Sequence, residues 1–237
     1  MILPEKREPV AVYQRADDGS LIEVFDVVGG DHSDLVGAIA EMHSAAFPEH
    51  PFVGPMIRER AASAIDAAAG VRPHQWLVQV DGATAGFVLF DSNVARKVAL
   101  SHYVYLRVES GVLTVDRRRL LGWLYRRIIE QLSRDCGGLP VLGLVGEAPG
   151  YRVPIFRWIG LKDFGIEFYE PVVGPQWQGP GSELRPLHLL WLPPDGIDPT
   201  SIEERARRAG SAAFLLDHYR FDLSEPWVAR AVGSTSE

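Results

Sequence analysis

Arg119-Leu120-Leu121-Gly122-Trp123-Leu124 is the stretch that decides the fold of this chain. An apolar run, Val112 to Val115, precedes it, and an amphipathic helix pattern follows it to about Arg134. A strand that passes into a helix through a turn with glycine leaves free backbone N–H groups at the helix start, where the helix dipole is also positive. Arg117 to Arg119 add positive charge at the same place. The pattern therefore predicts a binding site for a phosphate or pyrophosphate.

Composition limits the class of protein. At 237 residues the chain is long enough for one substantial domain, or one domain with an appendage. No stretch approaches the roughly 18 apolar residues of a membrane span, and the Met1 to Pro4 start does not resemble a signal peptide. Cys136 is the only cysteine, which excludes an internal disulfide and a cysteine-rich metal site and suits a reducing compartment. We therefore expect a cytoplasmic protein without a metal or a membrane partner.

The net charge of −7 argues against binding to nucleic acid, which needs a basic surface. It is compatible with an amine substrate drawn to an acidic cleft. Only Lys6, Lys97 and Lys162 are lysines among the 24 basic residues, and alanine and glycine are abundant. This bias indicates a GC-rich genome and a bacterial-like composition.

The first half of the chain predicts two hairpins and two helices. Val10 to Tyr13 and Leu21 to Val28 flank Asp18-Gly19, so a hairpin is expected over about residues 9–28. Asp31 or Ser33 is expected to cap a first helix that ends near Phe47, and a second helix is expected from about Gly54 to Ala69. The next expected element is a hairpin of strands 75–80 and 84–90 around the turn Asp81-Gly82. A long strand over residues 98–115 should follow it, with a kink at Ser110-Gly111.

The second half predicts helices alternating with strands. The helix from Leu120 to Arg134 is expected to bury Leu121, Leu124, Ile128 and Leu132. The expected elements after it are a buried strand at 140–145, a helix at about 151–159, a strand at 166–169 and a last strand at 184–192.

The six-residue stretch resembles motif A of the GCN5-related N-acetyltransferases, R/Q-x-x-G-x-G/A, which binds the pyrophosphate of acyl-coenzyme A. Arg119 and Gly122 match the pattern, and Leu124 stands where the family prefers a small residue. Residues 76–88 are similar to the family's hairpin of the second and third strands, and Phe156 to Leu161 to its late Tyr-Glu-Lys-x-Gly-Phe segment. The resemblance covers about residues 21–192. It implies an α/β (α+β) fold with a mixed, mostly antiparallel central sheet flanked by helices.

The resemblance also implies acetyl-CoA or another acyl-CoA as co-substrate. The backbone N–H groups of Leu120 to Leu124 would hold the pyrophosphate, and the strand edge at Leu113 to Val115 would pair with the pantetheine arm. The residues expected to contact the cofactor are Leu113, Thr114, Val115, Arg118, Arg119, Leu120, Leu121, Gly122, Trp123, Leu124 and Phe156.

The implied reaction is direct attack of a primary amine on the acyl group through a tetrahedral intermediate. A backbone N–H near Val112 would stabilise the oxyanion. The amine must lose a proton, and Glu109 beside the expected kink is the preferred base, with Glu147 at the end of the buried strand as second candidate. Either glutamate can also be a solvated or loop residue without a catalytic role. His102 lies on an apolar strand face and is expected to be a bonded core histidine.

Phe156 departs from the family, which often has a tyrosine there to protonate the leaving thiolate. Tyr151 can replace it only if its helix begins differently. Two hypotheses therefore stay open: an N-acyltransferase acting on a small-molecule amine, and a protein of the same fold that binds a ligand or a partner without acyl transfer. An aminoacyl-tRNA as acyl donor is a third, which the acidic charge disfavours.

The tail after residue 192 lies outside the resemblance. We expect residues 1–192 to form the acyltransferase domain and residues 193–237 a C-terminal helical arm. The arm has apolar residues at helical spacing, including Phe214 and Leu216, with Trp227 further on, so it must dock on its own core or on a second subunit. Members of the family are often dimers, so a homodimer is one expectation.

The acceptor pocket and the histidines complete the expectations. Trp177, in a loop rich in proline and glycine, and Phe52 are expected to line the acceptor pocket. No metal-ligand spacing is present, and the histidines at positions 32, 43, 50 and 74 are expected at the surface or at helix caps.

Overall fold

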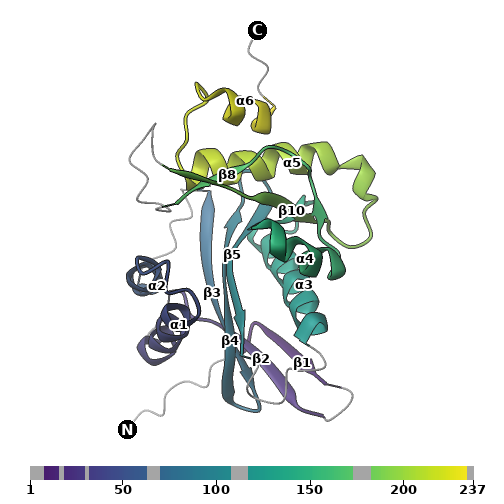
Figure 1. Ribbon diagram of the computed structural model, residues 1–237. Coiled ribbons are helices and arrows are strands. Elements are labelled where there is room, and N and C mark those ends of the chain that lie inside the picture. Colours follow the sequence, from purple (N-terminus) through teal and green to yellow (C-terminus); the bar gives the residue numbers. More distant parts are fainter. Residues whose placement is uncertain are drawn as a thin grey trace. The chain divides into compact units, whose positions relative to one another are not determined.

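The computed structural model describes residues 8–15, 19–29, 32–62, 70–107, 117–172 and 183–233 (Figure 1). The chain divides into two compact units: unit 1 comprises Met1–Asp91 and His102–Arg117, and unit 2 comprises Ser92–Ser101 and Arg118–Glu237. None of the helices in the described ranges is long and apolar enough to cross a membrane.

Unit 1 consists of neighbouring strands and a pair of helices. Its strands are hydrogen-bonded in chain order: β1 Ala11–Gln14, β2 Leu21–Asp26, β3 Val71–Val80, β4 Ala83–Asn93 and β5 Val98–Leu106, the last two continuing into unit 2. β2 is antiparallel to both β1 and β3. The helices α1 Ser33–Ala46 and α2 Val53–Ala62 lie side by side (Figure 1).

Both predicted hairpins are confirmed. Asp81 and Gly82 between β3 and β4 have φ angles of 48° and 78°, the pair of positive values that a tight hairpin turn requires and that aspartate and glycine tolerate. The cap of α1 differs from expectation: the residue before the helix is His32, without a side-chain cap bond, and Ser33 is already helical.

Unit 2 contains one parallel strand pair among antiparallel ones. Its strand order is β5, β6 Gly143–Ala148, β10 His188–Leu192 and β7 Lys162–Asp163. β5 and β6 are parallel, whereas β10 is antiparallel to both β6 and β7. β8 Tyr169–Pro171 and β9 Leu184–Pro186 form a separate antiparallel pair. The helical segments are α3 Arg117–Asp135, η2 Gly150–Arg152, α4 Val153–Trp158, η4 Pro199–Ser201, α5 Glu203–Ala212, the π-helix η5 Ala213–His218 and α6 Pro226–Val232. The expected mixed, mostly antiparallel fold with flanking helices is confirmed.

Some predicted boundaries are wrong. The buried strand begins at Gly143 instead of residue 140, because the backbone at Gly143 has a φ of 106° and turns there. The expected strand over 166–169 starts only at Tyr169. The expected last strand is two strands in different sheets, with the buried Leu187 between them donating its N–H to Phe168 O at 3.0 Å. An apolar run is compatible with either arrangement, and only the partners decide.

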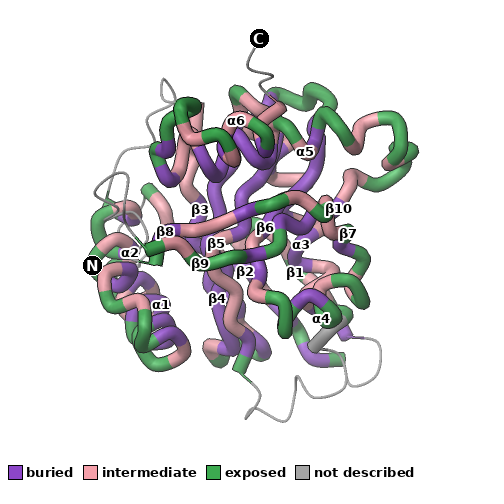
Figure 2. Tube along the Cα trace, turned by 45° about the horizontal axis from the view of Figure 1, so that its top comes forward, coloured by how far each residue is buried: buried purple, intermediate pink, exposed green. Residues whose placement is uncertain are grey.

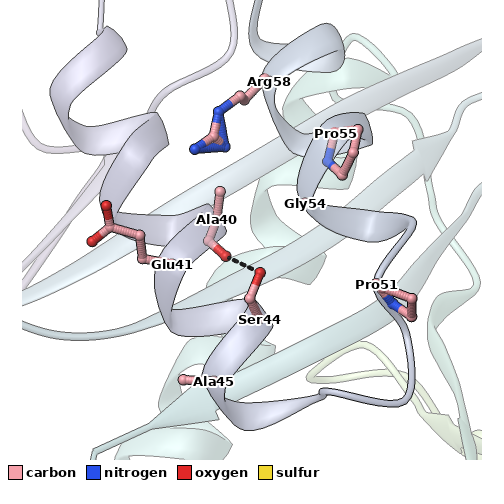
Figure 3. Close-up of a pocket in the computed structure, with 8 residues that line it drawn as sticks. All are labelled: Ala40, Glu41, Ser44, Ala45, Pro51, Gly54, Pro55 and Arg58. Carbon is pink, nitrogen blue, oxygen red and sulfur yellow. Dashed lines mark hydrogen bonds between the residues drawn. The ribbon is translucent and has the colours of Figure 1, made fainter.

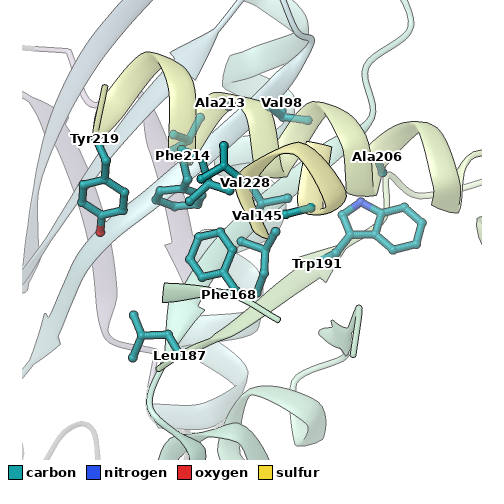
Figure 4. Close-up of a cluster of buried hydrophobic side chains, with 14 of the residues drawn as sticks. Val98, Val145, Phe168, Leu187, Trp191, Ala206, Ala213, Phe214, Tyr219 and Val228 are labelled. Carbon is teal, nitrogen blue, oxygen red and sulfur yellow. The ribbon is translucent and has the colours of Figure 1, made fainter. Parts of the chain in front are cut away.

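The C-terminal arm belongs to the core of unit 2. α5 has both buried and exposed residues along its length (Figure 2), as expected of a helix with one face in a core. Phe214 and Val228 from the arm pack in one cluster with Val145 of β6, Phe168 and Trp191 of β10 (Figure 4). The predicted docking of the arm is therefore confirmed, and it occurs on its own chain. The division of the protein at residue 192 stays a prediction.

Candidate functional site

The six-residue stretch lies entirely within α3, which begins at Arg117, earlier than expected. The first four N–H groups of a helix have no intrahelical partner, so in α3 these donors belong to residues 117–120 instead of 120–124. The first turn carries no acidic residue, and Arg119 is exposed in it. This end of α3 has the charge and the donors that attract an anion.

The buried face of α3 is largely the expected one, because Leu124, Ile128 and Leu132 are all buried. Leu120 and Leu124 are fully buried, whereas Leu121, expected inward, is only partly buried. Gly122 lies on the partly exposed side, and a Cβ there would meet only Ile159 Cβ, at an ordinary 3.9 Å. Leu124 thus fills core space.

α3 contacts α4 through two aromatic rings. Phe156 of α4 lies parallel to Tyr125 of α3, with an interplanar angle of 3° and 6.4 Å between ring centroids. Tyr125 accepts a long hydrogen bond of 3.4 Å from Ser101 Oγ of β5, and burial raises the pKa of its phenol to about 12. Ser101 is paired with Gly146 of β6, the residue before Glu147. Through Tyr125, α3 therefore contacts β5, and β5 pairs with β6, the strand that carries Glu147.

Glu147 is partly buried, and only one of its two carboxyl oxygens has a hydrogen-bond partner among the described residues. Its Oε2 accepts a hydrogen bond of 2.7 Å from the hydroxyl of Tyr219. Its Oε1 is buried, and among the described residues it has no hydrogen-bond partner. An unmatched buried acceptor is unfavourable unless a donor joins it, so this oxygen is suited to receive an N–H group from outside the described chain.

A second carboxylate lies close to Glu147. Glu170 of β8 has one oxygen 3.4 Å from the Tyr219 hydroxyl, and its other oxygen accepts a bond of 2.6 Å from Arg185 Nε of β9. Burial is the largest cause that raises the pKa of Glu147 well above its usual value, and the charge of Glu170 adds to it. The bond from Tyr219 and the charge of Arg185 oppose this rise.

Tyr151, the other catalytic candidate within the described residues, does not contact this cluster. Tyr151 lies in η2 and is 78% exposed, with the Arg152 guanidinium 5.6 Å from its ring centre. Glu109, the expected kink at 110–111 and the strand edge Leu113, Thr114 and Val115 lie outside the described residues, as does Trp177. The side chain of Arg118 is also outside them.

No sequence pattern indicates that Tyr219, Glu170 and Arg185 belong near Glu147. They come from three elements far apart along the chain, and Tyr219 belongs to the arm that the resemblance does not cover. An i, i+2 or i, i+4 pattern reports only neighbours on one strand or helix, so no such pattern connects them.

Of the histidine expectations in unit 1, one is confirmed and one is partly wrong. His102 is confirmed as a bonded core histidine, with Nε2 2.9 Å from Asp91 Oδ2, while Arg60 Nη1 is 3.1 Å from the other oxygen of Asp91. The expectation of surface or cap positions is wrong for His43 and His74, which are buried. His74 Nδ1 bonds Asp26 at 2.6 Å, and His43 lies among aromatic rings.

A groove of about 710 Å³ lies between α1 and α2 of unit 1 (Figure 3). Small side chains form its floor, and Glu41 and Arg58 project at its sides. Phe52 does not line this groove and packs against the core of unit 1. Its expected place in an acceptor pocket stays a prediction.

No protein-family model matches the chain, and no curated protein matches its sequence. Solved structures do resemble it. An aminoglycoside 6′-acetyltransferase of type Ii has a TM-score of 0.48 and 10% identity, covering 73% of this chain and 96% of its own. The Campylobacter jejuni N-acetyltransferase PseH in complex with acetyl coenzyme A has a TM-score of 0.42 and 10% identity, covering 73% and 98%. A mutant of the Vibrio cholerae spermidine N-acetyltransferase SpeG has a TM-score of 0.44 and 8% identity, covering 73% and 93%. The chain is similar to these acetyltransferases in structure, at low identity.

Proposed function

We propose that the protein is a GCN5-related N-acyltransferase that moves an acyl group, by default acetyl, from acyl-CoA to a primary amine. The observation that carries the proposal is Glu147, a partly buried residue whose carboxyl has a raised pKa and one buried oxygen without a partner among the described residues. An amine is protonated at neutral pH and must lose its proton before it can attack. A carboxylate whose pKa is raised is a stronger base than an ordinary glutamate and accepts that proton more readily.

The proposed cofactor site is the start of α3. The N–H groups of the first turn of α3 and the exposed Arg119 side chain would hold the pyrophosphate of acyl-CoA. Gly122 supports this assignment, because the space beside it holds no side chain closer than Ile159. Bound there, acyl-CoA supplies the activated carbonyl carbon that the amine attacks, and the thiolate departs as the carbon–sulfur bond breaks.

Glu147 is the proposed base. Its Oε1 would take the proton of the ammonium group, while Oε2 stays bonded to Tyr219. Glu109, on the segment outside the described residues, remains the other candidate and is tested in the same way. Tyr151 is the remaining candidate that would protonate the departing thiolate, because Phe156 has no proton to give.

Ligand binding without acyl transfer is the second candidate function. Phe156 favours it, because the ring that replaces the family's tyrosine packs against Tyr125 and supplies no acid. Acetyl-CoA would then bind to α3 without being consumed.

Two measurements separate these functions. Acetyl-CoA at a hundredfold excess over Kd should stabilise the folded protein by about 2.7 kcal/mol, seen as a higher Tm. Release of the CoA thiol should then depend on added primary amine across a panel of small amines. Stabilisation without amine-dependent release would support the second function. If millimolar acetyl-CoA causes neither stabilisation nor thiol release, both functions are rejected. Light scattering of the same sample tests the expected homodimer.

A further inference from the structure

The C-terminal arm brings a hydroxyl group to Glu147. Tyr219 follows the π-helix Ala213–His218, and its N–H bonds Phe214 O at 2.8 Å, a bond that spans one residue more than in an α-helix. Its ring is buried against Phe214 and Phe221, with centroids at 6.4 Å and 6.0 Å. In Figure 4 the ring lies at the edge of the hydrophobic cluster, with the hydroxyl at its outer end.

The Tyr219 hydroxyl has one proton and two carboxylates near it. Glu147 Oε2 lies at 2.7 Å and Glu170 Oε2 at 3.4 Å, so the donated bond goes to Glu147. Glu170 is held from its other side by Arg185, whose Nε and Nη2 both contact Oε1. Each carboxylate therefore has its own donor, and the geometry fixes which oxygen of Glu147 is engaged.

We infer that Tyr219 is a positioning residue for the proposed base: its hydroxyl holds Oε2 of Glu147 so that Oε1 is presented to the amine. This inference rests on the proposed function and extends it, because it makes the C-terminal arm part of the active site. A glutamate side chain has a freely rotating terminal torsion, and a bond to one oxygen restricts it. Tyr219 does not touch the reacting atoms.

The same contacts determine the pH range of the base. The groups that face Glu147 are Tyr219 from the arm, Glu170 from β8 and Arg185 from β9, while the residue opposite it on β10 is the apolar Leu189. A hydrogen bond to the charged carboxylate lowers its pKa, so loss of the Tyr219 hydroxyl should raise it. Loss of the Glu170 charge should lower it. A packing defect alone would not be expected to raise the pKa of Glu147 in one variant and lower it in the other.

The test uses the full-length protein with Tyr219→Phe and Glu170→Gln. Tyr219→Phe keeps the ring and its packing and removes only the hydroxyl. The matched control is Tyr169→Phe, whose hydroxyl bonds Glu167 at 3.0 Å on the surface. The titration of the Glu147 carboxyl is followed by NMR with ¹³C-labelled glutamate and assigned by loss of its signal in Glu147→Gln. The kcat/KM of amine acylation is measured over the same pH range.

We expect Tyr219→Phe to move the Glu147 titration and the acidic limb of kcat/KM to higher pH. Below the limb, kcat/KM should fall about tenfold for every pH unit by which the limb moves, and it should recover at alkaline pH. Glu170→Gln should move both to lower pH, and Tyr169→Phe should move neither. An unshifted Glu147 titration in folded Tyr219→Phe would overturn the inference. If Tyr219→Phe does not fold, a Glu170→Gln titration that fails to move down would overturn it.

The two proposals fail separately. A shift of the Glu147 titration in a protein that never releases thiol would keep the contact between Tyr219 and Glu147 and reject the acyltransferase function. Active enzyme whose pH profile is the same in wild type and Tyr219→Phe would keep the function and reject the positioning role.

Discussion

Gly210 of α5 lies so close to Val145 of β6 that a Cβ at position 210 would be 2.7 Å from Val145 Cγ1. Both residues are buried, and valine has a stiff side chain that cannot turn away easily. The absence of a side chain at position 210 is therefore what allows the C-terminal arm to rest on the sheet of unit 2.

Gly210→Ala should lower the free energy of unfolding by about 1–3 kcal/mol, the usual effect of overpacking. The expected direction is opposite to that of an unhindered helical glycine, where alanine stabilises by about 1 kcal/mol. Gly122→Ala is the matched control, because its Cβ would meet only Ile159, at 3.9 Å. Urea unfolding of both variants tests this, and a Gly210→Ala protein as stable as Gly122→Ala would contradict it.

Gly122→Glu should abolish binding of acetyl-CoA without unfolding the protein. The carboxylate would occupy the space beside α3 and repel the pyrophosphate. The measurement is the rise in Tm with acetyl-CoA, which should disappear in Gly122→Glu and persist in Gly122→Ala. Unchanged affinity in a folded Gly122→Glu protein would reject the assignment of this helix to the cofactor.

Glu147→Gln should lower kcat/KM by roughly 10²–10⁴-fold at neutral pH if Glu147 is the base. The loss should be smaller at high pH, where the amine is already deprotonated. Glu130→Gln is the control, because Glu130 pairs with Arg127 on the surface of α3 at 2.7 Å. A loss below about threefold would return Glu147 to a structural role.

Glu109→Gln is then the next variant to assay. If Glu109 is the base instead, its substitution should produce the same large loss and the same recovery at high pH, whereas Glu147→Gln should not. If both variants keep activity close to that of the wild-type protein, neither carboxylate takes the proton.

His43 should make stability depend on pH. Burial lowers its pKa from 6.5 to about 4, and the charge of His50 adds to this while Glu49 opposes it. The unfolded state therefore binds the proton at higher pH than the folded state does. Stability is full above about pH 6.5 and should fall toward pH 4, by up to about 1.4 kcal/mol per pH unit. His43→Leu should flatten this part of the stability curve, and an unchanged slope would contradict the prediction.

Removal of residues 194–237 should cause aggregation, because it uncovers the apolar surface that the arm covers in unit 2. Phe214→Ala is the milder variant and should lower the free energy of unfolding by about 3–5 kcal/mol, since Phe214 is fully buried. Size-exclusion chromatography and urea unfolding test the two variants. A truncated protein that stays soluble and equally stable would show that the arm is dispensable.

Local chemistry made much of the fold predictable. Asp81-Gly82 fixes a hairpin because both residues accept positive φ, and Pro226 begins α6 because proline suits the first turn of a helix. α3 follows from apolar residues at helical spacing and a glycine pair at its end. Each of these features depends on residues within a few positions of one another, which is the range over which sequence patterns carry information.

The candidate site was predictable only in part. Glu147 could be proposed from its place after a buried apolar run, and the proposed anion site at the start of α3 from its arginines and Gly122. Whether an apolar run forms one strand or two depends on its partners, and for this reason the break at Leu187 was not foreseen. The burial of His43 also depended on the aromatic rings of other elements.

The sequence by itself determined the hairpin turns, the helix that carries the motif and the apolar faces that must be covered. Only the tertiary structure decided that Tyr219 meets Glu147 across 72 positions and lies near Glu170 across 49. Secondary structure follows from steric and hydrogen-bonding rules that act within a few residues. The pKa of a carboxyl group and the direction of its free oxygen depend on desolvation and on charges that folding brings in from distant segments.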